Sequence, residues 1–232
     1  MKTFKKLVAF TLAETLIVMG VIGIVSALTL PNLNSSTGNK EKVAKVKKIY
    51  QNLTDAFGRA QAVYGPFDTW FINDNTDAAK VTRFGERLSE FMKVSKNCGK
   101  TITGCFYSGA YTLEHEGFAN CGASDQYSFI LSDGVAICLS GNPKYRIFVN
   151  IDGYGNGMPT RGKSAFNFDI VSGEILPQGY DITDSTLKNQ CFVNGTCTNW
   201  VIQYDNMDYL KANTNGVCPN GTQLSLTQTN CK

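Results

Sequence analysis

Residues 10–30 read FTLAETLIVMGVIGIVSALTL, and Glu14 is the only charged residue among them. About 20 apolar residues, at a rise of about 1.5 Å each, are enough to cross the hydrocarbon core of a bilayer as one helix. A short basic flank with Lys2, Lys5 and Lys6 precedes this stretch. The sequence therefore predicts a single membrane-spanning helix with a carboxylate inside it.

Three interpretations of this segment are open. A cleavable secretory signal would be cut after Ala27, because residues 25–27 loosely resemble a small-residue cleavage site, but the apolar run exceeds the usual length of roughly 7–15 residues. An ordinary membrane anchor leaves Glu14 unexplained, since a carboxylate inside a bilayer costs on the order of 3 kcal/mol or more. The third interpretation starts from the order of the residues: a lysine-rich leader ends at Ala9, Phe10 follows, and Glu14 comes four residues later.

This order resembles the N-terminal signal of type IV prepilins and type II secretion pseudopilins. The resemblance implies that a prepilin peptidase cuts between Ala9 and Phe10 and methylates the new N-terminus of Phe10. It also implies that Glu14 pairs with this amine on a neighbouring subunit and sets the register of subunits in a filament. The family usually has Gly before the cut, and Ala9 is another small residue in that place.

The resemblance also implies a set of partners. They are prepilin peptidase, other pilin or pseudopilin subunits, an inner-membrane assembly platform and the membrane itself, with no small-molecule substrate. The implied location is the bacterial inner membrane, crossed once with the C-terminus outside, followed by an extracytoplasmic filament.

Pro31 follows the apolar run, and a proline inside a helix removes a backbone donor and clashes with the preceding turn. We therefore expect a helix kink at Pro31. Further on, apolar residues recur at steps of three and four, which predicts one apolar helical stripe: Val43, Val46, Tyr50, Leu53, Phe57 and Ala60. A basic amphipathic helix of this kind could bind a membrane surface, but we favour packing on its own domain.

All eight cysteines lie in the last 135 residues. There is no C-x-x-C, which argues against a zinc ribbon or a thioredoxin-type redox motif. An even number of cysteines in a region rich in Gly and Asn indicates disulfides formed in an oxidising compartment. The connectivity is not fixed by the sequence, and the simplest hypothesis pairs neighbours: Cys98 with Cys105, Cys121 with Cys138, Cys191 with Cys197, and Cys218 with Cys231.

Beyond residue 64 the pattern changes to short segments separated by turn residues. Apolar spacing predicts a short helix over residues 78–94, and either a helix or a strand and turn over residues 199–211. Alternation predicts strands over residues 127–131, 135–139, 146–151 and 165–171, with Asp133 and Gly134 forming a hairpin turn. Residues 98–122 show no period.

Together these signals predict an α+β fold. A long N-terminal helix, transmembrane and then amphipathic, would pack on a disulfide-bonded antiparallel β-meander head, as in pilins. The predicted organisation is a cleaved cytoplasmic leader (1–9), the transmembrane half of the helix (10–34), its amphipathic half (35–64) and an extracytoplasmic globular head (65–232).

The loop that begins near Asn150 resembles a pattern of pseudopilin-like heads, some of which bind calcium there. The candidate ligands are Asn150, Asp152 and Asn156, with Ser164 further along. Calcium takes about six to eight oxygen ligands, and carboxylates supply most of the affinity. Because these residues offer only the carboxylate of Asp152, a turn held by glycines is favoured over a calcium site. We expect no other cofactor.

The sequence does not predict an enzyme. It has one histidine and no G-x-S-x-G, H-E-x-x-H or phosphate-binding Gly-rich motif. A net charge of +3 excludes a strongly basic nucleic-acid binder on electrostatic grounds. The leading hypothesis is a structural subunit of a type IV pilus or a type II secretion pseudopilus. The alternative is a minor pilin that acts as a binding module in adhesion, DNA uptake or recognition of secretion substrates, because one fold serves both roles.

Overall fold

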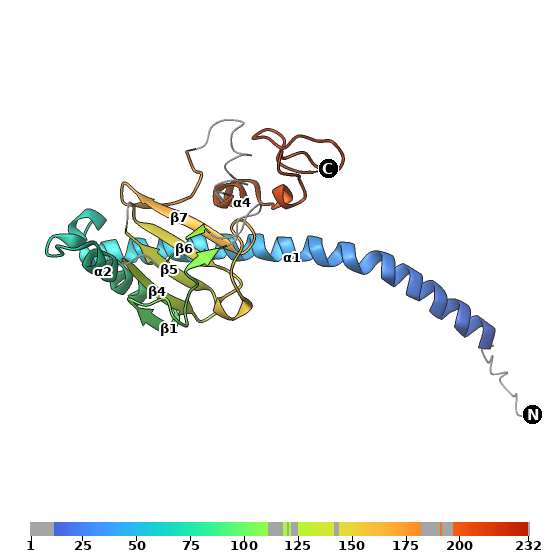
Figure 1. The fold of residues 1–232 in the computed structure, drawn as a ribbon, viewed down its shortest axis with the longest axis horizontal. Coiled ribbons are helices and arrows are strands. Elements are labelled where there is room, and N and C mark those ends of the chain that lie inside the picture. Colours follow the sequence, from blue (N-terminus) through green and yellow to red (C-terminus); the bar gives the residue numbers. More distant parts are fainter. Residues whose placement is uncertain are drawn as a thin grey trace, which may run out of the picture. The chain divides into compact units, whose positions relative to one another are not determined.

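Figure 1 shows the computed structural model of the chain. The structure describes residues 12–110, 118–119, 121, 125–141, 144–181, 191 and 197–231; for residues 27–37, 110 and 118–119 the description covers the backbone only. The chain divides into two compact units, Met1–Lys40 and Glu41–Lys232.

Helix α1, Leu12–Tyr64, is assigned without interruption over 53 residues. It continues through Pro31 and through the polar stretch that follows. The side chain of Pro31 lies outside the described residues, so the kink stays a prediction. Residues 41–64 of this helix belong to the second compact unit.

The predicted membrane-spanning segment is corrected by the structure. In the part of the chain that the structure describes, no helix is long and apolar enough to cross a membrane. The transmembrane part of the predicted fold and the single-pass inner-membrane location are therefore wrong.

The α+β class with an antiparallel sheet and disulfides is confirmed. One sheet has six strands in the order β1-β4-β5-β6-β7-β8, and every neighbouring pair is antiparallel. Strands β4 to β8 follow one another as a meander, and β1 is added at the edge beside β4 (Figure 1). The strands are β1 (Val94–Gly99), β4 (Gln126–Leu131), β5 (Ala136–Ser140), β6 (Arg146–Asn150), β7 (Ala165–Val171) and β8 (Glu174–Pro177).

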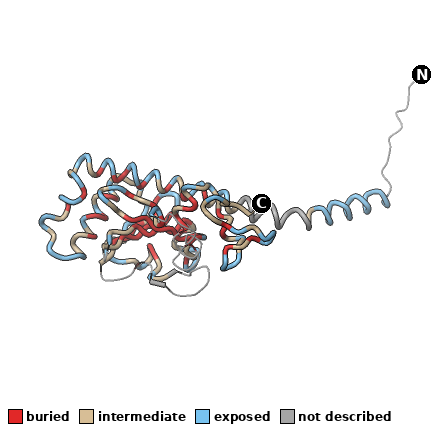
Figure 2. The backbone as a smooth tube through the Cα atoms, turned by 90° about the horizontal axis from the view of Figure 1, so that it is seen from above, coloured by how far each residue is buried: buried red, intermediate tan, exposed pale blue. Residues whose placement is uncertain are grey.

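The apolar stripe of residues 43–60 packs into the core of the second unit. Leu53 and Val46 have no exposed surface, and Tyr50 stacks on Phe168 of β7 with ring centroids 5.5 Å apart. Figure 2 shows buried positions recurring along this half of α1. The stripe therefore packs on its own domain, which is the alternative that the sequence favoured.

Shorter helices complete the second unit. The 3-10 helix η1 (Phe67–Phe71) and helix α2 (Asp77–Glu90) follow α1, and the Thr76 side chain caps α2 by accepting the N–H of Ala79 at 3.2 Å. Helix α2 ends four residues before the predicted end, where the chain turns into β1. Over residues 199–211 the helical alternative holds, because α4 (Thr198–Tyr204) and η3 (Asp208–Leu210) occupy this segment.

Four disulfides lie in the second unit. They join Cys98 to Cys105, Cys121 to Cys138, Cys191 to Cys197, and Cys218 to Cys231. These are the neighbour pairs expected from the sequence. Cys98 belongs to β1 and Cys138 to β5. Two further short strands, β2 (Gly109–Ala110) and β3 (Phe118–Ala119), form a separate antiparallel pair.

Candidate functional site

The N-terminal part of α1 presents a continuous apolar surface. Nine large apolar side chains are between 53 % and 79 % exposed: Leu12, Leu16, Ile17, Val18, Met19, Val21, Ile22, Ile24 and Val25. Because successive residues of a helix are turned by about 100°, these positions cover its whole circumference. A helix that is apolar on all sides is stable only when other apolar groups surround it.

Glu14 lies in the first turn of α1 and is exposed. A carboxylate in this place is favoured by the partial positive charge at a helix N-terminus. It is the only carboxylate among the apolar residues 12–26. Ala9 and Phe10 lie outside the described residues, so the cleavage and methylation site stays a prediction.

The lysines at the start of the amphipathic half bind acidic residues of three head loops. Lys42 Nζ lies 2.8 Å from Asp152 Oδ2, in the loop after β6. Two further pairs join α1 to the head: Lys47 to Asp205 at the end of α4, at 2.8 Å, and Lys48 to Asp133 in the β4–β5 turn, at 2.9 Å. We call these three ion pairs the lysine clamp.

The lysine clamp gives the basic residues of this helix a structural role. Partial burial raises the pKa of the Asp133 carboxyl, but the Lys48 ammonium and the backbone N–H of Val135 outweigh it, so that the pKa of Asp133 is lowered. The sequence described this helix as basic and amphipathic but did not indicate the partners of its lysines. The only available signal was the excess of lysines over acids on the helix itself.

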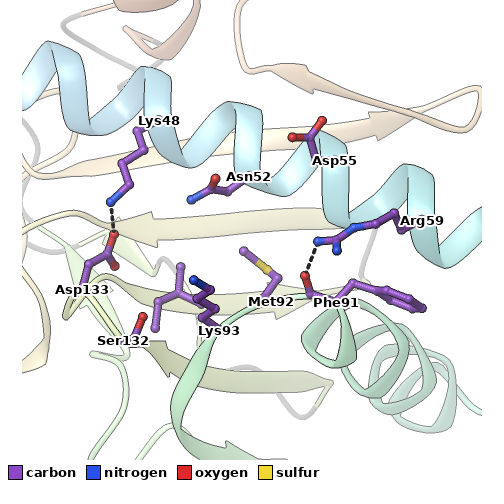
Figure 3. A pocket seen from close by; sticks show the side chains of 10 residues that line it. Lys48, Asn52, Asp55, Arg59, Phe91, Met92, Lys93, Ser132 and Asp133 are labelled. Atoms are coloured by element: carbon purple, nitrogen blue, oxygen red, sulfur yellow. Dashed lines mark hydrogen bonds and ion pairs between the residues drawn. The ribbon is translucent and has the colours of Figure 1, made fainter.

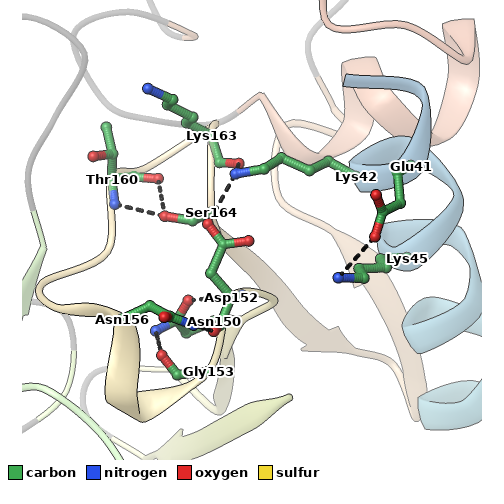
Figure 4. Close-up of polar contacts among 10 residues, drawn as sticks. All are labelled: Glu41, Lys42, Lys45, Asn150, Asp152, Gly153, Asn156, Thr160, Lys163 and Ser164. Atoms are coloured by element: carbon green, nitrogen blue, oxygen red, sulfur yellow. Dashed lines mark hydrogen bonds and ion pairs between the residues drawn. The ribbon is translucent and has the colours of Figure 1, made fainter. Parts of the chain in front are cut away.

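The loop after β6 is held by its own side chains (Figure 4). Asn150 is buried, its Nδ2 donates to the carbonyl of Gly153 at 2.9 Å, and its Oδ1 accepts the N–H of Asp152 at 3.2 Å. Asn156 Nδ2 donates to the carbonyl of Asp152. Gly153 has a φ of 80°, which favours glycine. Between Gly153 and Gly157 the chain makes the short 3-10 helix η2 (Tyr154–Asn156).

The three candidate calcium ligands are thus close in space but already engaged. Lys42 supplies a cation to the carboxylate of Asp152, and its Nζ also donates to the carbonyl of Lys163 at 3.3 Å. Ser164 Oγ accepts the N–H of Thr160 at 2.9 Å. Among the described residues no group of three His, Cys, Asp or Glu side chains is placed to hold a metal ion. This geometry favours a closed turn, the alternative that the single carboxylate of the loop already suggested.

A groove of about 380 Å³ lies between α1 and the head. One wall is a face of α1 with Lys48, Asn52, Asp55 and Arg59. The opposite wall comprises the segment that leads from α2 into β1 and the end of β4 with its turn (Figure 3). No local sequence pattern indicates this groove, because its walls are far apart along the chain.

Comparison with family models, with curated proteins and with solved structures yields no match. The likeness to pilins therefore rests on the residues themselves, chiefly on the order of Ala9, Phe10 and Glu14 before the apolar helix.

Proposed function

We propose that this protein is a structural subunit of a filament of the type IV pilin or pseudopilin kind, assembled through the N-terminal part of α1. The observation that carries the proposal is the set of nine exposed apolar side chains around residues 12–25. Full burial of a Leu, Ile, Val or Met side chain is worth about 1.5–3 kcal/mol, so a helix with nine of them gains much by association.

Other copies of the same helix are suitable surroundings. A surface that covers the whole circumference of a helix can contact several neighbours at once. Contacts between different faces of identical subunits build an open helical filament when the rotation between neighbours does not close a ring. The tightly packed head, with its own core and four disulfides, would be carried by each subunit without taking part in this burial.

Glu14 would give this apolar assembly its register. Once chains pack together, a carboxylate among apolar side chains needs a cation, because a buried unpaired charge is strongly unfavourable. After cleavage between Ala9 and Phe10 by a prepilin peptidase, the amine of N-methyl-Phe10 on a neighbouring copy would be such a cation. This pairing would fix the axial position of one subunit against the next.

N-terminal sequencing and mass analysis of the protein from cells that contain a prepilin peptidase test the proposal. We expect the chain to start at N-methyl-Phe10 and to be eight hydrogens lighter than the reduced chain, because four disulfides are formed. A chain that starts at Leu28 would show that a secretory signal was removed, and the proposal would be wrong.

The variant Glu14→Ala separates maturation from assembly. We expect normal cleavage and methylation but few or no filaments in electron micrographs, whereas the neighbouring change Thr15→Ala leaves filaments intact. Filaments of normal number and length from Glu14→Ala would refute the proposed pairing.

A further inference from the structure

The groove between α1 and the head combines an apolar floor with charged walls. Phe91, Met92 and Leu131 line it, and Figure 3 shows Phe91 and Met92 opposite α1. The wall on α1 runs from Lys48 to Arg59, which is about 16 Å of helix. An elongated groove of this length suits about five residues of extended chain better than a compact small molecule.

Two cations in the groove, Arg59 and Lys93, take part in none of the ion pairs among the described residues. Both residues are exposed. Asp55 also lines the groove, but its carboxylate is on the side of α1 away from Lys93 (Figure 3). Lys48, at the other end, is neutralised by Asp133 at 2.9 Å.

Arg59 is held in place by Phe91. Its Nη2 donates to the carbonyl of Phe91 at 2.6 Å, and its guanidinium lies 5.7 Å from the centroid of the Phe91 ring. A guanidinium has five N–H donors in a planar fork that matches a carboxylate. The contact with Phe91 uses one of these donors and fixes the plane, so that the loss of side-chain entropy on binding a carboxylate is small.

We propose that this groove binds an acidic segment of a partner protein, with an apolar side chain on Phe91 and Met92 and carboxylates on Arg59 and Lys93. The charge of the groove argues for this partner: Arg59 and Lys93 line it beside the apolar floor, and these two cations outnumber Asp55, the one lining carboxylate outside the ion pairs of the described residues. A basic segment would meet repulsion there, and a purely apolar one would leave both cations without a counter-charge. The proposal is independent of the filament function, because the groove lies wholly in the second compact unit.

The probe is a fluorescein-labelled peptide of alternating glutamate and leucine, five residues long, titrated into the full chain and followed by fluorescence anisotropy. We expect saturable binding that weakens as salt is raised, because exposed charge pairs are screened. Arg59→Gln and Lys93→Gln should each weaken binding about threefold or more, in line with about 0.7 kcal/mol for an exposed pair. Lys100→Gln, which removes an exposed lysine outside the groove, should leave the affinity unchanged.

A charge-reversal variant shows whether weaker binding comes from the changed charge or from a general loss of folding. Lys93→Glu should reject the glutamate–leucine peptide and bind the matching lysine–leucine peptide more tightly than the unchanged protein does. The proposal fails if the unchanged protein binds both peptides equally, if it binds neither, or if Lys100→Gln weakens binding as much as Arg59→Gln.

Discussion

The two halves of helix α1 are both rich in apolar residues, yet they use them in opposite ways. Leu16, in the first half, is 65 % exposed, whereas Leu53, in the second half, is fully buried. The apolar residues of the second half fall on one stripe, which the sheet covers, and the lysines beside it reach acidic loops. Those of the first half cover the whole circumference. The arrangement of apolar residues, rather than their number, decides whether a helix is buried within its own domain.

Removing the same side chain from each half should give the largest difference. Leu53→Ala should lower the free energy of unfolding of the head by about 3 kcal/mol, because it removes a buried side chain and leaves a cavity. Leu16→Ala should change it by less than about 0.5 kcal/mol, because exposed positions contribute little. Denaturant unfolding with the disulfides intact measures both. If the two variants lost equal stability, the contrast between the halves would be wrong.

Removing a disulfide tests the stability of the head without changing α1, since the cysteines lie outside this helix. Replacing Cys121 and Cys138 by alanine together opens a link between residues 17 apart. We expect a loss of about 3 kcal/mol, because the unfolded chain regains the entropy of the closed loop. Unfolding of the head, followed by tryptophan fluorescence, gives the value. A loss below about 0.5 kcal/mol would mean that packing of β5 alone holds this segment.

The lysine clamp should make the stability of the head dependent on acidic pH. The folded-state pKa of Asp133 is lowered, so its contribution is present above the unfolded value of about 3.9 and is lost as pH falls through the folded value. Asp133→Asn should therefore cost at most about 1 kcal/mol at pH 7 and nothing well below pH 3. Urea unfolding between pH 7 and pH 2 tests this. A cost that stays constant over this range would exclude the ionic origin.

Calcium should have the smallest effect of all. Since Lys42 already provides a cation to Asp152, we expect millimolar calcium or EDTA to leave the melting temperature unchanged within about 1 °C. The variant Lys42→Met offers a sharper test, because it frees the carboxylate. A rise of several degrees with calcium in the unchanged protein would show that the loop binds the ion after all, as the mass-action relation between ligand and stability requires.

The sequence predicted those strands whose pattern reflects burial on the sheet. Strands β4 and β5 were found because apolar residues flank Asp133 and Gly134, and β7 because its residues alternate. Strand β1 was missed since its middle residues are exposed and it pairs on one side only, with two register irregularities. Strand β8 was missed because it has only four residues and ends at Pro177.

The candidate sites also divide into those whose residues are contiguous in the chain and those whose residues only the fold brings together. The apolar run after Phe10 and the carboxylate of Glu14 are contiguous in the chain, so the sequence displays them directly. The partners of the lysine clamp are not: Lys48 and Asp133 are 85 residues apart, and Lys42 and Asp152 are 110 apart. No local pattern can indicate such a pair, because only the register of the sheet brings the loops beside α1.

By itself the sequence indicated the helical nature of residues 12–64 and the strands β4 to β7, whereas the neighbour pairing of the cysteines was one hypothesis among several. These follow from short-range periodicity, turn chemistry and spacing. Tertiary structure alone decided which apolar residues are buried, that Lys42 faces Asp152, and that Arg59 and Lys93 line one groove. Burial and charge pairing depend on which distant segments pack together, and this is settled only when the sheet and helix α1 assemble into one core.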